Sequence, residues 1–204
     1  MKYLAIDIGN VICRMDFEKF LDQLAITLSI TRNKAFDVLY RIQKLQDLGV
    51  LTISEEMALH YKTSDSAVKQ AIELWNNTMM ADPFVVSGLL ELMSKGVKVA
   101  LLSNMGMEHR SIIRHVISPA IYDNSVEFFS CDVGARKPSY LYYKTFLDMY
   151  PEFKGCVYID DRPENIEASL KFGFEGCCFD LSSFKSNDDM EEMFNSLKIL
   201  VLNS

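Results

Sequence analysis

Tyr3-Leu4-Ala5-Ile6-Asp7-Ile8-Gly9-Asn10-Val11 joins an apolar run to an aspartate and a glycine-containing turn. Two later segments also place polar residues directly after an apolar run: residues 99–102 precede Ser103-Asn104, and residues 156–159 precede Asp160-Asp161. Strands that are apolar throughout are typical of a parallel sheet covered on both faces. Because ligands bind beyond the carboxyl ends of such strands, we expect these polar residues to meet in one crevice.

From residue 83 onward, helical and strand-like patterns alternate along the chain. We predict helices over 84–94, 108–116, 140–150 and 164–172, and strands over 97–102, 126–130, 156–160 and 177–179. This alternation is typical of βαβ units, so the predicted fold class is α/β, with a doubly wound, Rossmann-like parallel sheet. Residues 182–189 have the composition of a loop, and the last residues are expected to fray.

Residues 11 to about 82 show helical periodicity instead. Apolar residues recur at helical spacing in four runs, which begin near Phe17, Thr31, Ser54 and Ser66. Four helices joined by short loops form a small bundle. We therefore predict a core domain of residues 1–14 and 83–204, and a helical cap domain of residues 15–82 inserted after the first strand.

Composition limits the classes of partner. The 204 residues carry a net charge of −7 and no Lys/Arg run, which argues against a nucleic-acid-binding surface. No apolar stretch approaches the roughly 18 residues of a membrane span, and the early Asp7 argues against a signal peptide. The five cysteines include no C-x-x-C pair, so we expect reduced thiols in a cytoplasmic protein.

The strand-end carboxylates suggest a nucleophile and a metal site. Asp7 before the Gly9 turn is placed like a catalytic nucleophile, although alone it is more typical of an ordinary turn. Adjacent Asp160 and Asp161 repel each other at a semi-buried strand end unless a cation lies there. Mg²⁺ prefers carboxylate, water and phosphate oxygens, so a magnesium site is the sharper interpretation of this pair.

Three further residues fit a phosphoryl group. Ser103 and Asn104 supply a hydroxyl and an amide that can hold phosphoryl oxygens. Lys137, just before Pro138, supplies an ammonium that can neutralise a nucleophile and a transferring group. Each feature alone is typical of a turn or a solvated loop, so the hypothesis depends on all of them occurring in order at element ends.

Together these segments resemble the four motifs of the haloacid dehalogenase-like (HAD) hydrolase superfamily. The matching segments are residues 7–11, 103–104, 137–138 and 160–165, and the resemblance covers nearly the whole chain. The helical insertion after the first motif is similar to the C1 cap of that superfamily. Residues 49–56 are similar to a turn common in such caps.

The resemblance implies a role for each motif residue. Asp7 would attack phosphorus and form an aspartyl-phosphate, and Lys137 would balance the charge of Asp7 and the phosphoryl group. Ser103 would hold a phosphoryl oxygen, with Asn104 supporting the site.

The same resemblance implies a Mg²⁺ site. Asp7, the backbone carbonyl of Gly9 and Asp161 would bind the ion, with Asp160 binding or orienting it.

One departure from the superfamily pattern concerns proton transfer. Most phosphatases of this kind carry a second aspartate, the general acid and base, where this chain has Gly9. Asp16 and His60 are the candidate replacements, although Asp16 also suits a helix N-cap. We expect His109 and His115 to lie on an exposed helix face.

The predicted function is a Mg²⁺-dependent phosphatase of a small phosphorylated metabolite, with sugar phosphates among the candidates. A metal-independent 2-haloacid dehalogenase is one alternative, because those enzymes also lack the second aspartate. A non-catalytic protein that binds a phosphorylated ligand or a protein partner is another. The sequence indicates neither a nucleic-acid nor a membrane partner, and it carries no signal for an oligomeric state.

Overall fold

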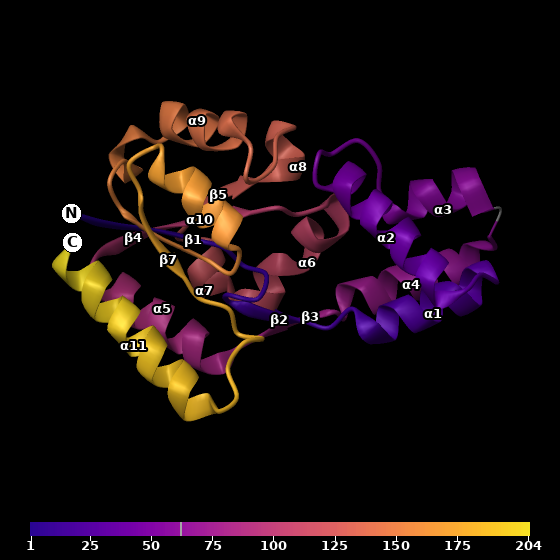
Figure 1. Ribbon diagram of the computed structural model, residues 1–204, viewed down its shortest axis with the longest axis horizontal. Helices are drawn as coiled ribbons and strands as arrows, with labels where there is room; N and C mark the ends of the chain where they lie inside the picture. Colours follow the sequence, from indigo (N-terminus) through magenta and orange to yellow (C-terminus); the bar gives the residue numbers. More distant parts are fainter. Residues whose placement is uncertain (62) are drawn as a thin grey trace.

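A five-stranded parallel sheet lies at the centre of the computed structural model, which describes residues 1–61 and 63–204 without the side chains of Ala58 and His60. The strand order is β5-β4-β1-β6-β7 (Figure 1). The strands are β1 (Lys2–Ile6), β4 (Val97–Ser103), β5 (Val126–Phe129), β6 (Val157–Asp160) and β7 (Glu175–Cys178). The predicted α/β class with a parallel sheet is confirmed.

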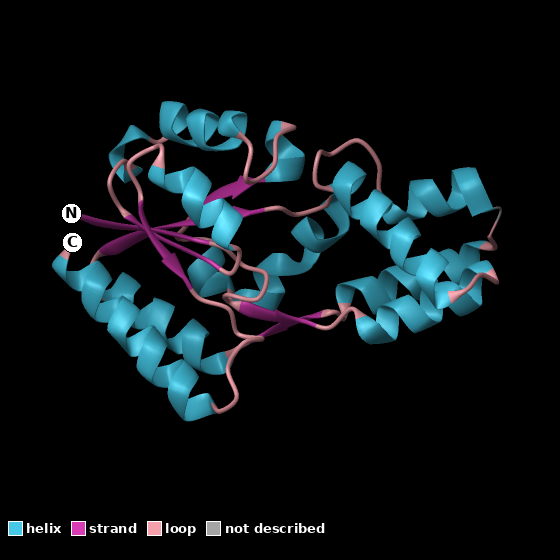
Figure 2. Ribbon diagram, viewed as in Figure 1, coloured by secondary structure: helices cyan, strands magenta, loops and turns pink. Residues whose placement is uncertain are grey.

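Helices cover both faces of this sheet, as Figure 2 shows. One face packs against α5 (Pro83–Ser94), α6 (Met107–Ile117), α7 (Pro119–Tyr122) and α11 (Asn187–Asn203). The other packs against α9 (Tyr140–Met149), η1 (Pro151–Phe153) and α10 (Pro163–Leu170), with the short α8 (Ser130–Val133) following β5. Because side chains alternate along a strand, Ile6 joins the first core and Ala5 the second.

The register of the sheet aligns the motif residues. Ile6 of β1 is paired with Leu101 on one side and with Ile159 on the other. Asp7 therefore leaves β1 level with the ends of both neighbours, and its N–H donates to the Ile159 carbonyl at 2.9 Å. This alignment places Asp7 and Asp160 at one edge of the sheet.

The predicted helical insertion is present and has its own core. It consists of α1 (Glu18–Leu28), α2 (Arg32–Gln46), α3 (Ile53–Tyr61) and α4 (Asp65–Asn76), and buried Phe20, Leu24, Leu39, Ile42 and Trp75 pack between these helices. Two short antiparallel strands, β2 (Cys13–Met15) and β3 (Met79–Ala81), carry the chain to the helices and back (Figure 1). At three residues each, these strands are too short to leave a periodic signal. The proposed domain limit at 14/15 falls within β2, and the limit at 82/83 follows β3.

The C-terminal segment differs from the expected loop and frayed end. The predicted loop, residues 182–189, overlaps α11, which begins at Asn187 with the Ser186 side chain accepting from the Asp189 N–H at 3.2 Å. The buried side chains of α11 recur at helical spacing: Met190, Phe194, Leu197 and Val201. The helical period was therefore present in the sequence, and the polar stretch before it concealed where the helix begins.

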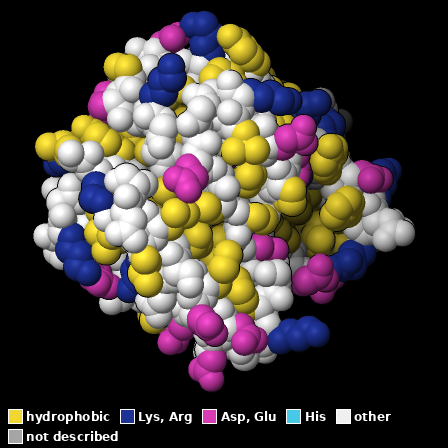
Figure 3. Space-filling view, turned by 60° about the vertical axis from the view of Figure 1, so that its left-hand side comes forward, with side chains coloured by type: hydrophobic (Ala, Val, Ile, Leu, Met, Phe, Trp, Pro, Cys, Tyr) yellow, Lys and Arg dark blue, Asp and Glu magenta, His cyan; other side chains and the backbone are white. Residues whose placement is uncertain are grey.

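The surface carries charges of both signs. Acidic and basic side chains are interspersed over the face shown in Figure 3, with several acidic side chains at its lower edge.

The five cysteines are all unpaired, as predicted. None of the helices within the described residues has both the length and the apolar character needed to cross a membrane.

Candidate active site

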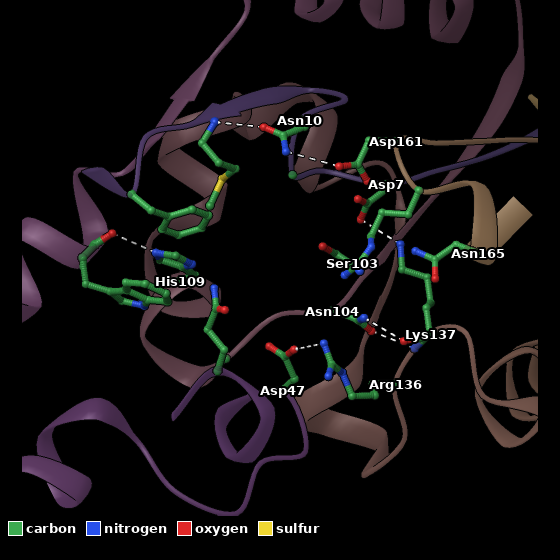
Figure 4. A pocket seen from close by; sticks show the side chains of 17 residues that line it. Asp7, Asn10, Asp47, Ser103, Asn104, His109, Arg136, Lys137, Asp161 and Asn165 are labelled. Carbon is green, nitrogen blue, oxygen red and sulfur yellow. Dashed lines mark hydrogen bonds and ion pairs between the residues drawn. The ribbon is translucent and has the colours of Figure 1, made fainter. Parts of the chain in front are cut away.

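A cavity of about 180 Å³ lies between the carboxyl ends of the strands and the helical insertion (Figure 4). The sheet side contributes most of the predicted residues: Asp7, Gly9, Ser103, Asn104, Lys137 and Asp161. The insertion contributes Phe17, Gln43, Asp47 and Trp75, and α6 contributes His109. The predicted convergence is therefore present, except that Asp160 lies behind the cavity wall and does not line it.

Lys137 is the centre of a buried charge network. Its Nζ atom lies 2.9 Å from Asp7 Oδ1 and 2.7 Å from Asp160 Oδ2, and it also donates to the Leu102 carbonyl at 2.7 Å. Burial opposes the charged ammonium, but the Asp160 and Asp7 carboxylates overcome this effect and raise the pKa of Lys137 above its ordinary value. Two hydrogen bonds and the ion pair with Asp7 thus fix the Lys137 ammonium beside the Asp7 carboxylate.

Asp160 is fully buried and surrounded by donors. Its Oδ1 accepts from the Arg162 N–H at 2.9 Å and from Asn165 Nδ2 at 2.8 Å, and its Oδ2 accepts from Lys137 and the Tyr158 hydroxyl. Burial favours the neutral form, but the Lys137 charge and these hydrogen bonds lower the pKa of Asp160 below its ordinary value. Since a carboxylate offers about four acceptor positions, protein donors engage them all.

Asp161 faces the cavity with fewer partners. Asn10 Nδ2 donates to its Oδ2 at 3.2 Å, and burial together with the charges of Asp7 and Asp160 raises the pKa of Asp161 to about 7. One oxygen from each of these three aspartates lies within 4.8 Å of the others. Three carboxylates facing one ammonium leave an excess of negative charge, which suits a divalent cation.

Ser103 and Asn104 follow β4 and have different tasks. Asn104 forms a reciprocal pair with the backbone of Lys137: its Nδ2 donates to the Lys137 carbonyl at 3.0 Å, and its Oδ1 accepts the Lys137 N–H at 2.8 Å. The buried Ser103 hydroxyl makes no hydrogen bond to another described residue and lines the cavity. Asn104 therefore positions the lysine loop, while Ser103 is available to a ligand.

Aromatic rings form the opposite wall. His109 stacks on Trp75 with ring centroids 4.7 Å apart, and its Nε2 lies 2.9 Å from the Trp75 carbonyl oxygen. Burial lowers the pKa of His109 to about 4, so the ring is neutral at neutral pH. The prediction that His109 is exposed is wrong, because α4 of the insertion covers that face of α6. His115 is exposed, as predicted.

Asp47 and Arg136 line the cavity side by side and form an ion pair that the sequence reasoning missed. Asp47 directly follows α2 of the insertion, and its Oδ2 lies 2.8 Å from Arg136 Nη2. Burial raises the pKa of Asp47 to about 6 even though the Arg136 charge opposes this shift. A local signal is Gly49, whose φ of +67° favours glycine. Any side chain added there would place its Cβ 2.4 Å from the Cys131 carbonyl oxygen. That close approach brings the segment after α2 against the sheet domain.

Solved structures with this architecture establish the fold. A HAD family enzyme from Bacteroides thetaiotaomicron, solved with magnesium and inorganic phosphate, matches 91% of this chain and 98% of its own, with a TM-score of 0.76 and 21% identity. The chain has a haloacid dehalogenase-like fold. A HAD phosphatase from Thermococcus onnurineus matches 97% of both chains, with a TM-score of 0.65 and 16% identity.

Similarity in sequence covers a smaller part of the chain than similarity in fold. A flavin mononucleotide hydrolase from Arabidopsis thaliana is 34% identical over 62 residues, which are 30% of this chain. The match spans only 25% of that relative's length. No family model matches the chain.

Of the two predicted replacements for the missing acid, the structure describes the side chain of Asp16. Asp16 is exposed, does not line the cavity, and accepts the Glu18 N–H at 3.2 Å, as a residue that caps α1 would. The side chain of His60 lies outside the described residues. Gly9 does line the cavity, and a Cβ added there would meet only the Met15 side chain, with Cγ at 3.7 Å and Sδ at 4.0 Å. The loop that carries Asp7 therefore offers the cavity a glycine, without an acidic side chain, two residues after Asp7.

Proposed function

We propose that the protein is a Mg²⁺-dependent phosphatase that hydrolyses a small phosphorylated metabolite through an aspartyl-phosphate. The observation that carries this proposal is the position of Asp7, which lies at the cavity with its carboxylate 2.9 Å from the buried Lys137 ammonium. A nucleophile needs a charge partner that does not itself react, and a buried ammonium held by Asp160 and the Leu102 carbonyl meets that requirement. Ser103 and Asn104 lie beside this pair, where phosphoryl oxygens would be held.

The residues present fit a magnesium ion. Asp7, Asp161 and the Gly9 carbonyl would supply hard oxygen ligands, and the excess of carboxylates over ammonium groups supplies the charge. We assign Asp160 the role of orienting Lys137. Protein donors already engage both Asp160 oxygen atoms, and one of these donors is the Lys137 ammonium. When bound, Mg²⁺ would offset the negative charge of the phosphoryl group as the carboxylate approaches.

The protein groups then divide the chemistry. A carboxylate oxygen of Asp7 attacks phosphorus, the bond from phosphorus to the leaving oxygen breaks, and water later hydrolyses the aspartyl-phosphate. Lys137 and the Ser103 hydroxyl hold charge on the phosphoryl oxygens during both steps. Because Lys137 is already fixed by Asp160 and Leu102, little reorganisation is needed when that charge develops.

The size of the cavity supports a small substrate. At about 180 Å³ it is smaller than the roughly 300–1,000 Å³ of sites that enclose drug-sized ligands. Sugar phosphates of the kind suggested by the sequence fit this scale. Flavin mononucleotide belongs in the substrate panel because of the partial match to a hydrolase of that compound. Binding of so large a molecule would need the insertion to move away from the sheet.

The dehalogenase alternative is weaker on the same observations. A metal-independent reaction needs no cation at the strand ends. Here burial and the charges of Asp7 and Asp160 disfavour the ionised form of Asp161 and raise its pKa, and a bound cation would relieve this repulsion. Chloride release from 2-chloropropionate in the presence of a chelator would favour the dehalogenase. Phosphate release that stops when the metal is chelated would favour the phosphatase.

The direct test replaces Asp7 with the nearly isosteric asparagine. We expect Asp7→Asn to lower phosphate release by roughly 10⁴-fold or more, as loss of a nucleophile does in other covalent mechanisms. Asp16→Asn is the matched control, because it makes the same chemical change at an exposed site and should leave the rate unaltered. Freshly prepared Asp7→Asn protein that is folded and retains a tenth of the activity would contradict the proposal.

A further inference from the structure

We propose that Asp47, presented by the helical insertion, is the general acid that donates a proton to the leaving group. This inference rests on the proposed phosphatase function and assigns the role for which Gly9 has no side chain. It follows from the position of Asp47 on the cavity wall and from the chemistry of the other lining groups.

The other ionisable groups on the sheet side cannot serve. Asp7 is committed as nucleophile, and Asp161 lies within the carboxylate cluster proposed for the metal. Lys137 donates to Asp160 and Leu102 and is ion-paired with Asp7, and the two carboxylates raise its pKa, so it does not release a proton to a leaving group. The cavity's guanidinium groups do not release protons in proteins.

His109 is excluded by its tautomer. The Trp75 carbonyl oxygen can only accept, so the 2.9 Å contact requires the proton of His109 to be on Nε2. Because burial lowers the pKa of His109 to about 4, the ring is neutral at neutral pH and Nδ1 carries no proton. Nδ1 can therefore accept a hydrogen bond from a substrate but cannot donate one. Asp47 is the remaining carboxyl group among the described residues that line the cavity.

The placement of Asp47 suits a leaving group. In phosphoryl transfer the leaving oxygen lies opposite the attacking oxygen, so it points away from Asp7. Figure 4 shows Asp47 across the cavity from Asp7, on the side formed by the insertion. Its side chain retains 12% of its accessible surface, so the carboxyl group is reachable from the cavity.

The charges around Asp47 keep it able to hold a proton. Burial and Asp7 favour the neutral acid, whereas Arg136, Lys137 and Arg162 favour the carboxylate, and the result is a pKa of about 6. The neighbouring Cys131 thiol stays neutral, because burial raises its pKa to about 11. A bound phosphate ester adds negative charge near Arg136 and so favours the neutral acid further. A pKa near the working pH is the best compromise for general acid catalysis.

The proton balance closes over the two steps. As Asp7 attacks, the bond between phosphorus and the leaving oxygen breaks, and the Asp47 proton passes to that oxygen to give the free alcohol. Asp47, now a carboxylate, accepts a proton from the water that attacks the aspartyl-phosphate. Inorganic phosphate leaves, and Asp7 and protonated Asp47 are restored.

The test compares two leaving groups in the full-length protein with Mg²⁺. An aryl phosphate needs little proton donation, whereas a primary-alcohol phosphate needs much. For Asp47→Asn we expect kcat/KM to fall roughly 10²–10³-fold on the alcohol ester and to stay within about threefold on the aryl ester. Equal losses of kcat/KM on both esters would overturn the role of Asp47 and leave the proposed function standing. Wild-type protein that releases phosphate from neither ester would overturn the proposed function itself.

Two further variants separate acid catalysis from contact between the insertion and the sheet domain. Glu108 joins the two, accepting from Gln46 Nε2 at 2.5 Å and from the Ile53 N–H at 2.8 Å, and it does not line the cavity. Glu108→Ala should change kcat/KM by the same factor on both esters. A loss in this variant that is confined to the alcohol ester would contradict the inference. Asp47→Glu, which keeps the acid, should recover part of the activity on the alcohol ester.

The pH profile supplies a readout that a structural role would not produce. On the alcohol ester, wild-type kcat/KM should fall as the pH rises through about 6, because Asp47 must be protonated in the free enzyme. This limb should be absent on the aryl ester and in Asp47→Asn. An identical limb for both esters in the wild type would overturn the assignment.

Discussion

The two walls of the cavity are built on different principles. On the sheet side, Lys137, Asp7 and Asp160 form a buried ionic network whose donors and acceptors are matched within 3 Å. On the side of the insertion, Trp75 and His109 present stacked neutral rings, and Asp47 is the main charge. The difference suggests a division of labour in which the sheet fixes the reacting group and the insertion meets whatever is attached to it.

The largest expected effect tests the ionic wall through Lys137→Met. This change leaves Asp7 and Asp160 buried without their cation, and breaking such a pair costs about 3–5 kcal/mol. We expect the free energy of unfolding from urea titration to fall by about that amount and phosphate release to be lost. Lys144→Met, which removes an exposed ion pair with Asp148, is the control and should cost less than about 1 kcal/mol. A Lys137→Met protein as stable as the control would show that the sheet wall is not held by charge.

A smaller effect concerns pH and metal at Asp161. Its pKa is about 7 when folded against 3.8 ordinarily, so the folded state binds more protons between these values. The melting temperature of metal-free protein should therefore fall as the pH rises from 5 to 8. Asp7 and Asp47 contribute in the same direction because burial raises their pKa values too, whereas His109 opposes them below about pH 6.5 because burial lowers its pKa. Asp160, whose pKa is lowered, affects stability only at more acidic pH.

Mg²⁺ and a substitution provide the control for that measurement. Added Mg²⁺ should raise the melting temperature most at pH 8, where the carboxylates are ionised. Asp161→Asn should flatten the pH dependence and weaken the response to Mg²⁺. A response to Mg²⁺ that is unchanged in Asp161→Asn would place the metal elsewhere.

The smallest effect is expected on the aromatic wall. The indole Nε1 of Trp75 has no hydrogen-bond partner among the described residues, so Trp75→Phe removes no such bond. It weakens the stack on His109, which is worth about 1 kcal/mol. We expect KM to change a few-fold while kcat stays nearly constant. A loss confined to kcat would mean that the aromatic wall takes part in the chemistry.

The sheet wall was predictable because the apolar run directly before each polar residue marks it as the end of a buried strand. Parallel strands that end in Asp7 and Asp160 place both residues at the carboxyl end of the sheet. The hydrogen bonds that distinguish Asp160 from Asp161 were not predictable, because they come from Tyr158, Asn165 and the Lys137 loop.

The wall formed by the insertion was not predictable, because it depends on how two packed units meet. His109 lies on a helix whose polar face appears solvated until α4 covers it. Asp47 follows a helix, where acidic residues are usually exposed, and the turn at Gly49 is the local sign that it approaches the sheet. No periodicity within a single helix encodes that contact.

The paired strands β2 and β3 have a consequence for how such a protein can change over time. Cys13 is paired with Ala81 and Met15 with Met79, so the chain leaves the sheet domain and returns to it at neighbouring points. Any module whose two ends lie close together could be grafted between these strands without altering their attachment. Selection could then exchange the whole of α1–α4 for another fold and alter which molecules are accepted, while Asp7 and Lys137 stay where they are. Asp7 and Lys137 lie outside the exchangeable segment, whereas the proposed acid Asp47 lies within it, so each such exchange would also have to supply a new proton donor.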